Sequence, residues 1–133
     1  MYLLGDIGNT EIKICLVNSN YKILKRIVFK TNLISYKYLN DNLSSFLKYS
    51  KNIQKILFSS VVPLAYKKIK FFILKKFKKK SSELKEIKIK NFVQSNVDRK
   101  QVGSDRIANA IGVINNKENF IVVDFGTATT FDV

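Results

Sequence analysis

Two short apolar runs, each followed by an Asp-x-Gly turn, dominate the pattern of apolar and polar positions. Residues 2–4 lead into Gly-Asp-Ile-Gly-Asn-Thr at 5–10, and residues 120–123 lead into Asp-Phe-Gly-Thr-Ala-Thr-Thr at 124–130. Glycine after a strand allows a bend in which backbone N–H groups are free to face an anion, and Asn and Thr add short polar groups. A single Asp-x-Gly also makes ordinary turns, but two copies in the same context predict two phosphate-binding loops.

The rest of the chain alternates between strand and helix periods. Residues 11–17 place Ile12, Ile14 and Leu16 on one face at period two, which predicts a strand antiparallel to the first. Further strands are expected at 21–31, 55–58, 86–93 and 120–123, helices at 35–49, 64–79 and 105–114, and a polar loop at 94–101. The order βββαβαβα up to the third helix predicts an α/β domain in which helices pack on a mixed sheet.

The second Asp-x-Gly segment predicts the start of a second structural unit. If it repeats the first, it needs a returning strand and a further sheet, yet the sequence stops at Val133. We therefore expect one lobe at 1–117, followed at 118–133 by the first strand and phosphate loop of a truncated second lobe. Residues 130–133 are expected to form an exposed apolar end without a partner strand, so that continuation or oligomerisation is needed for stability.

Composition is typical of a folded domain. The chain has 133 residues, 46% of them hydrophobic, with a single Cys15 and no His, so an internal disulfide is excluded and any general base must be Asp, Glu, Lys or Tyr. No apolar run approaches the roughly 20 residues that a membrane span needs, and the N-terminus lacks the basic start of a signal peptide. These features predict a cytoplasmic protein without a membrane partner.

The charge leaves more than one interpretation open. Against 10 acidic residues there are 24 Lys and Arg, a formal net charge of +14, which is compatible with a nucleic acid or an anionic surface. Much of the excess lies in the expected helix at 64–79, where a basic amphipathic helix on a membrane or a nucleic acid is one interpretation. We favour a core-packed helix with a solvated Lys face, and we expect no nucleic-acid partner.

Three acidic residues occupy positions from which a carboxylate could bind a cation or accept a proton. Asp6 and Asp124 each end an apolar run, a position from which a carboxylate reaches Mg²⁺ or another cation. Asp105, in Gly-Ser-Asp-Arg at 103–106, opens a helix, so it is either an N-cap or first-turn acid, or a base kept ionised by the helix dipole and by Arg106. The residues alone do not decide between these two interpretations.

Four ordered segments resemble the motifs of type III pantothenate kinases. They are Asp-Ile-Gly-Asn-Thr at 6–10 with Lys13, Ser-Ser-Val-Val-Pro at 59–63, Val-Gly-Ser-Asp-Arg-Ile-Ala-Asn-Ala at 102–110 and Val-Val-Asp-Phe-Gly-Thr-Ala-Thr-Thr-Phe-Asp at 122–132. The resemblance covers nearly the whole chain but only about the N-terminal half of a typical member. It implies an actin-like, ribonuclease H-like lobe of a two-lobed kinase that phosphorylates pantothenate with ATP, the first step of coenzyme A synthesis.

The resemblance also implies roles for individual residues. The first phosphate loop would hold ATP with Mg²⁺, Gly103 to Arg106 would contact pantothenate with Asp105 as the proton acceptor, and Asp124 would bind K⁺ or NH₄⁺. By motif position, the residues implied to bind ATP are Asp6, Ile7, Gly8, Asn9, Thr10, Glu11, Ile12, Lys13 and Thr127, and Asp6 would also bind the Mg²⁺ of Mg-ATP. The residues implied to bind pantothenate are Gly103, Ser104, Asp105 and Arg106. The family implies a homodimer, and the missing half implies a complementing C-terminal chain.

The sequence departs from the family pattern at two places. Asn-Val-Asp-Arg at 96–99 stands where members commonly carry an aromatic residue and an Asn-Pro pair, and Ser104 stands where Ala is usual, a change we expect to matter little. The alternatives are a catalytically inactive nucleotide-binding or regulatory module of the same fold and a basic nucleic-acid-binding domain. Phosphoryl transfer needs alignment and charge neutralisation, which the four motifs supply without His.

Overall fold

A five-stranded mixed sheet forms the centre of the molecule. The computed structural model describes residues 1–87, 101–114, 118–126 and 128–132. The strands are β1 (Tyr2–Ile7), β2 (Glu11–Val17), β3 (Ile23–Lys30), β4 (Lys55–Ser60) and β5 (Ser82–Glu83), in the spatial order β3-β2-β1-β4-β5. The pairs β1–β2 and β2–β3 are antiparallel, whereas β1–β4 and β4–β5 are parallel. This confirms the predicted mixed α/β fold.

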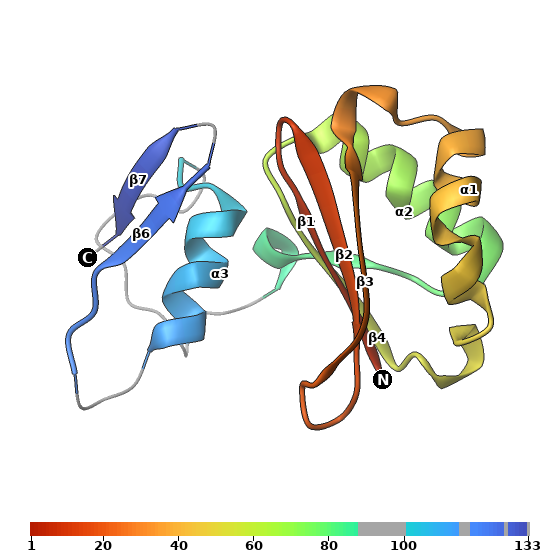
Figure 1. The fold of residues 1–133 in the computed structure, drawn as a ribbon, viewed down its shortest axis with the longest axis horizontal. Helices are drawn as coiled ribbons and strands as arrows, with labels where there is room; N and C mark the ends of the chain where they lie inside the picture. The colour runs from red at the N-terminus through yellow and green to blue at the C-terminus, as the bar shows by residue number, and fades with distance from the viewer. Residues whose placement is uncertain (88–100, 115–117, 127, 133) are drawn as a thin grey trace.

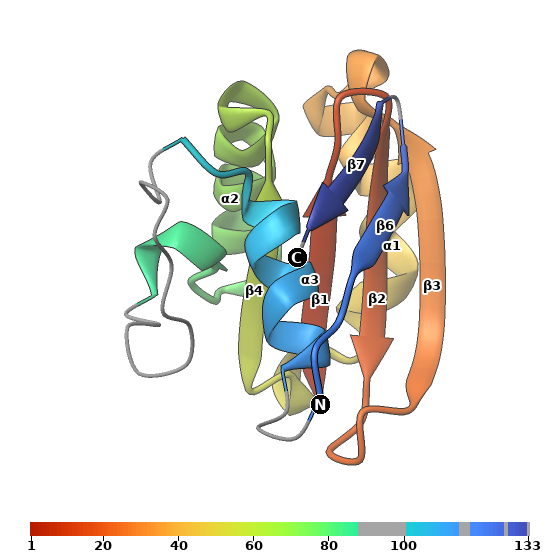
Figure 2. The same ribbon diagram turned by 90° about the vertical axis from the view of Figure 1, so that its left-hand side faces the viewer.

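The two faces of the sheet carry different elements (Figures 1 and 2). Helices α1 (Tyr36–Leu47) and α2 (Pro63–Phe77) cover one face, while α3 (Ser104–Val113) and a separate hairpin lie on the other. The hairpin consists of β6 (Val122–Phe125) and β7 (Thr129–Asp132). Three short 3₁₀ helices, η1 (Thr31–Leu33), η2 (Ser50–Asn52) and η3 (Leu84–Glu86), complete the described elements.

The main core lies between the sheet and helices α1 and α2. Alternation along the strands directs every second side chain toward the helices, and the helical period directs one stripe of each helix back. The fully buried members are Leu3 and Ile7 of β1, Ile12, Ile14 and Leu16 of β2, Leu39, Leu43 and Phe46 of α1, Phe58 of β4, and Ile69, Phe72 and Ile73 of α2. Each such side chain contributes about 1.5–3 kcal/mol on burial, so this core holds the fold together.

Local signals account for the bounds of the two core helices. Ser35 is the N-cap of α1, where its Oγ accepts a hydrogen bond from the backbone N–H of Tyr38 at 3.2 Å. Pro63 is the first residue of α2, and Lys78 ends that helix in the left-handed region at φ 56°. Helix α2 buries Ile69, Phe72 and Phe77 among others, so the interpretation as a core-packed helix with exposed Lys residues is confirmed. The described helices are all too short or too polar to span a bilayer.

The strand predicted at 86–93 differs from the structure. Strand β5 comes earlier, at Ser82–Glu83, and η3 follows it directly. The cause is a capping box, in which the Glu83 carboxylate accepts from Lys85 N at 2.7 Å and the Glu86 carboxylate accepts from Glu83 N at 3.1 Å. Residues 88–93 and most of the polar loop predicted at 94–101 lie outside the described residues.

The expectation of an unpaired C-terminal segment is wrong. Strand β7 pairs antiparallel with β6, with Val123 opposite Phe131 and Phe125 opposite Thr129. The returning strand therefore lies within the four residues that follow the second turn, because Thr and Phe favour extended structure. The segment predicted as the beginning of a second unit forms a two-stranded sheet that is separate from the main sheet.

A close approach inside the sheet makes Gly5 sensitive to substitution. A Cβ at Gly5 would collide with the ring of Phe58, its partner on β4, so Gly5→Ala should destabilise the chain by about 1–3 kcal/mol through overpacking. The matched control is Gly112→Ala in α3, where a Cβ would meet no atom within 4 Å and the exposed helix should gain about 0.5–1 kcal/mol. Urea unfolding of both variants measures the difference, and equal effects would contradict the close approach.

Candidate active site

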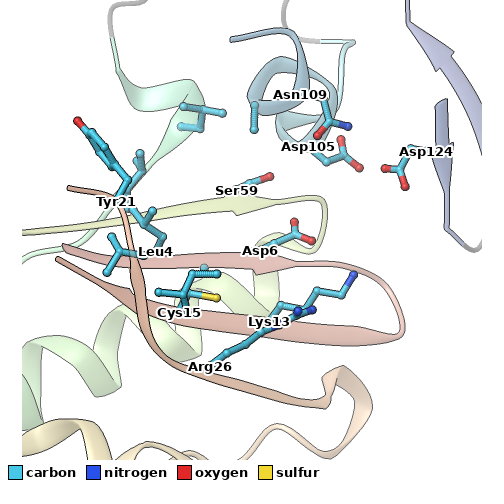
Figure 3. Close-up of a pocket in the computed structure, with 16 residues that line it drawn as sticks. Leu4, Asp6, Lys13, Cys15, Tyr21, Arg26, Ser59, Asp105, Asn109 and Asp124 are labelled. Carbon is cyan, nitrogen blue, oxygen red and sulfur yellow. The ribbon is translucent and has the colours of Figure 1, made fainter. Parts of the chain in front are cut away.

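A pocket of about 620 Å³ lies on the sheet face opposite α1 and α2. Its side chains come from four strands of the main sheet, from α3 and from β6, and Figure 3 shows several carboxylates gathered at one end. The lining residues are Leu4, Gly5, Asp6, Lys13, Cys15, Val17, Tyr21, Ile23, Arg26, Leu57, Ser59, Leu84, Asp105, Ala108, Asn109 and Asp124. The pocket therefore has a charged end and an apolar floor, which is the usual character of a ligand site.

Asp6 is held at the charged end by the pairing of β1 with both of its neighbours. It lies opposite Lys13 of β2 and opposite Ser59 of β4. Burial raises the pKa of Asp6, the Lys13 ammonium opposes this, and the carboxylates of Asp105 and Asp124 raise the pKa further. The carboxylates of two other elements thus act on Asp6 in the same part of the pocket.

Asp105 is a first-turn acid whose carboxylate also lines the pocket. The N-cap of α3 is Gly103, which has no side chain to cap the helix, and Oδ1 of Asp105 accepts a hydrogen bond from Arg106 N at 2.8 Å. A Cβ at Gly103 would collide with this same Oδ1, so glycine is what allows the carboxylate to occupy its position. Asp105 is therefore a first-turn acid, and its carboxylate is also available to a ligand in the pocket.

Ser104 fastens α3 to the main sheet. Its side chain is fully buried, and its Oγ donates to the carbonyl oxygen of Ser60 at 2.8 Å and accepts from the N–H of Ser60 at 3.2 Å. Strand β5 pairs only with Leu57 and Phe58 of β4, so the backbone of Ser60 has no partner on β5. The Ser104 side chain supplies the missing hydrogen bonds to the Ser60 N–H and carbonyl. The serine that was expected to matter little thus sets the position of Asp105 relative to β4.

Arg106 links α3 to the hairpin. Its Nε and Nη2 both contact Oδ1 of Asp132, and Nη2 also donates to the Phe131 carbonyl oxygen at 3.4 Å. The Asp132 carboxylate raises the pKa of Arg106. On β6, Asp124 lies on the less exposed face of the hairpin and lines the pocket. The guanidinium expected to contact pantothenate is therefore engaged with Asp132.

The two Asp-x-Gly segments, predicted to be phosphate-binding loops, are both hairpin turns in the structure. Gly8 N–H donates to Glu11 O at 3.0 Å, and Gly126 N–H donates to Ala128 O at 3.2 Å. These two N–H groups are consequently used within the turns and do not face an anion. Thr31, which sequence reasoning did not single out, supports the first turn, because its Oγ1 donates to Gly8 O at 2.8 Å and its N–H donates to Thr10 O at 2.9 Å.

The other members of the predicted ATP-binding set fall into three places. The side chains of Ile7 and Ile12 are buried in the core on the opposite sheet face, so only their backbone could meet a ligand. Those of Asn9, Thr10 and Glu11 are exposed at the first turn. Thr127 lies outside the described residues. Arg26 and Asn109 line the pocket without having been predicted as site residues. Asn109 lies within the motif at 102–110, one helical turn after Asp105, whereas no motif contains Arg26.

The carboxylates fit a cation that is shared with a ligand. Among the described residues, no three His, Cys, Asp or Glu side chains converge closely enough to form a metal site by themselves. Carboxylate oxygens are nevertheless suitable for Mg²⁺ and for K⁺, and a cation beside Asp6 would offset the burial that raises the pKa of this carboxyl. Asp6 and Asp124 could each supply one ligand, with phosphate oxygens supplying others.

The raised pKa of Asp6 predicts a pH-dependent effect on stability. A carboxyl pKa raised above its ordinary value of 3.8 favours the folded chain at low pH, and this contribution is lost as the pH rises through the folded pKa. Asp6→Asn should therefore melt higher than the wild type at pH 8, and the difference should vanish below about pH 4. Asp41→Asn on the exposed side of α1 is the charge-matched control. A pH-independent difference for Asp6→Asn would contradict this account.

The contact of Ser104 with β4 predicts a loss of stability in Ser104→Ala. Removing this hydroxyl leaves the N–H and carbonyl of Ser60 without these hydrogen bonds, which costs about 1–3 kcal/mol. Ser44→Ala is the control, because Ser44 is exposed on α1 and its hydroxyl makes only a 3.4 Å bond to Asp41 O. Chemical denaturation measures both free energies of unfolding, and a Ser104→Ala value within 0.5 kcal/mol of the control, roughly the scatter of surface substitutions, would refute the role of the hydroxyl.

Comparison with known proteins identifies the family of the chain. The sequence profile of the family described as type III pantothenate kinase matches residues 2–133. A protein named type III pantothenate kinase from Pelagibacter ubique is 51% identical over 100% of this chain, which covers 54% of that protein. Proteins of the same name from a Sulfurihydrogenibium species and from Mycoplasma mobile are 38% identical over 100% of this chain and 35% identical over 97% of it. The chain covers 55% and 52% of these two proteins, respectively. The chain thus spans about half the length of these relatives. Matched over almost every residue, the chain belongs to the type III pantothenate kinase family.

Proposed function

We propose that this chain forms part of an enzyme that transfers the γ-phosphate of ATP to pantothenate, giving 4'-phosphopantothenate in the first step of coenzyme A biosynthesis. The observation that carries the proposal is the convergence of Asp6, Asp105 and Asp124 from β1, α3 and β6 on one end of the pocket, with Lys13 beside them. Phosphoryl transfer requires this combination of carboxylates for cations and for a proton, and a cationic side chain for phosphate oxygens.

Asp105 is the proposed proton acceptor. Its carboxylate is held at the start of α3, where Gly103 leaves room for it. In this position it would take the proton of the pantothenate hydroxyl as the oxygen attacks the γ-phosphorus. Lys13 would neutralise phosphate charge from β2, and Mg²⁺, when bound near Asp6, would supply further neutralisation of the phosphates.

The first turn is the proposed phosphate loop. Residues 6–13 would hold ATP through the Asp6 and Lys13 side chains in the pocket and through the exposed turn residues Asn9, Thr10 and Glu11. Ile7 and Ile12 would contribute only backbone atoms, and a contact through the Gly8 N–H would require its hydrogen bond to Glu11 O to open. By the same assignment Thr127 would contact ATP from the second turn, and Asp124 would bind K⁺ or NH₄⁺.

Residues 103–106 are the proposed pantothenate contact. The Ser104 hydroxyl is engaged with Ser60 and the Arg106 guanidinium with Asp132. Contact through Gly103 and Ser104 would therefore use the backbone at the start of α3, whereas a contact through Arg106 would require this side chain to leave Asp132. With Ser104 and Arg106 engaged in this way, Asp105 is the side chain of residues 103–106 that would contact the acceptor hydroxyl.

The proposal includes a second lobe that completes the site. We assign 1–117 to an actin-like lobe and 118–133 to the first strands of a second one, because the hairpin is separate from the main sheet. Its outer face exposes Val123, Phe125 and Phe131 at 40%, 82% and 63%, and such an apolar face is suited to further structure from a complementing half or a homodimer partner. We place the reaction in the cytoplasm, where ATP and Mg²⁺ are supplied.

Turnover with matched variants tests this function. The chain is assayed for transfer of labelled γ-phosphate from ATP to pantothenate with Mg²⁺ and K⁺, both alone and co-expressed with the remaining half of the Pelagibacter ubique relative. Asp105→Asn should lower turnover by about 10²- to 10⁴-fold, the usual contribution of a positioned base, without changing the stabilisation by Mg-ATP. Asp41→Asn is the control. A folded, ATP-stabilised complex without turnover would instead identify an inactive nucleotide-binding module.

A further inference from the structure

Ser59 occupies a central place in the pocket that the proposed mechanism does not use. It lies near the end of β4, directly opposite Asp6 on β1, and its neighbour Ser60 holds the start of α3 through Ser104. Figure 3 shows Ser59 on the strand between Asp6 below and Asp105 above. The space in front of Ser59 is therefore bordered by the carboxylate proposed for the nucleotide side and by the carboxylate proposed for the acceptor hydroxyl.

The hydroxyl of Ser59 is buried and makes no hydrogen bond of normal geometry to the described residues. Its Oγ exposes less than 1 Å² and finds no hydrogen-bond partner in the described parts of the chain. The other two hydroxyls at this junction are engaged, since Ser60 Oγ accepts from Val62 N at 3.2 Å and Ser104 Oγ bonds to the Ser60 backbone. Ser59 lowers the pKa of Asp6 as a side-chain hydrogen-bond donor, although the contact between its Oγ and the carboxylate falls outside normal hydrogen-bond geometry.

An unengaged buried hydroxyl at the wall of a pocket is best explained by a ligand. Buried polar atoms without a partner are rare in native proteins, because desolvation is then uncompensated. The nearby ionised carboxylates are acceptors only, whereas a serine hydroxyl can donate one hydrogen bond without adding charge. A group rich in acceptor oxygens that passes between Asp6 and Asp105 would satisfy the hydroxyl, and a phosphoryl group has this chemistry.

We propose that Ser59 is a contact residue for the γ-phosphoryl group, to which its Oγ–H donates a hydrogen bond in bound ATP and during transfer. This inference rests on the proposed function. The bond from the γ-phosphorus to the bridging oxygen of ADP breaks as the acceptor oxygen bonds to phosphorus, and the acceptor proton goes to Asp105. Ser59 remains unmodified and acts as a neutral donor where negative charge concentrates.

Nucleotide preference tests the contact without requiring turnover. Melting curves and calorimetric titrations of the 133-residue chain are recorded with Mg-ATP and, separately, with Mg-ADP, which lacks the γ-phosphoryl group. The wild type should bind Mg-ATP more tightly, and Ser59→Ala should lose about tenfold or more in Mg-ATP affinity with no change for Mg-ADP, since hydrogen bonds to charged groups are strong. Ser59→Thr keeps the hydroxyl and should restore the preference.

Ser60→Ala separates this role from a structural one. Removing the Ser60 hydroxyl takes an acceptor from Val62 N, so the variant should melt lower but keep its preference for Mg-ATP. Ser59→Ala should show the opposite pattern, because its hydroxyl finds no hydrogen-bond partner of normal geometry among the described residues and its loss should not lower the melting temperature.

The outcomes distinguish the inference from the function on which it rests. Wild-type chain that neither nucleotide stabilises, either alone or co-expressed with the remaining half of the Pelagibacter ubique relative, would overturn the proposed function and the inference with it. Wild-type chain that binds both nucleotides equally, or Ser59→Ala that keeps the full preference for Mg-ATP, would overturn the contact alone while leaving the kinase assignment in place.

Discussion

The pairing of β1 with β2 on one side and with β4 on the other is the interaction on which the site depends. One register places Lys13 beside Asp6, and the other places Ser59 beside it. Strand side chains alternate, so the same pairing sends Leu3 and Ile7 into the core and Asp6 into the pocket. A slip of one residue would exchange the two faces, burying Asp6 among apolar side chains. Core packing and the placement of the carboxylate are therefore a single constraint.

Helix α3 carries this arrangement from the main sheet to the hairpin. Ser104 bonds to the end of β4, and Arg106, two residues later, contacts Asp132 of β7. A small apolar cluster around Leu84 and Ile107 supports the helix from the side of η3. Asp105 lies between the two attachments, so its position relative to Asp6 and Asp124 is determined by contacts on both sides.

The order of the elements could be predicted from the sequence because it depends on local periodicity. Apolar alternation identified β2, and helical spacing identified α1 and α2 to within a few residues. The prediction failed where elements are very short. Strand β5 has two residues and is followed by a capping box, and the returning strand β7 has four. Periodicity cannot be recognised over so few positions.

The candidate site was accessible from the sequence only in part. Asp6, Lys13, Asp105 and Asp124 lie in motifs, and all four line the pocket. The contacts that position them join distant parts of the chain, since Ser104 meets Ser60 across 44 positions and Arg106 meets Asp132 across 26. Such contacts depend on tertiary packing, so neither the importance of the Ser104 hydroxyl nor the unengaged state of Ser59 could be inferred from local pattern.

The two attachments of α3 differ in kind, and this difference has a consequence for domain motion. The Ser104 hydrogen bonds are buried, whereas the Arg106 side chain is 43% exposed, so water and salt can compete for its contact with Asp132. If the hairpin rotates relative to the main sheet, the exposed ion pair yields first and α3 stays with the sheet. The contact between Arg106 and Asp132 is therefore the weaker of the two attachments, and breaking it would free a guanidinium beside Asp105.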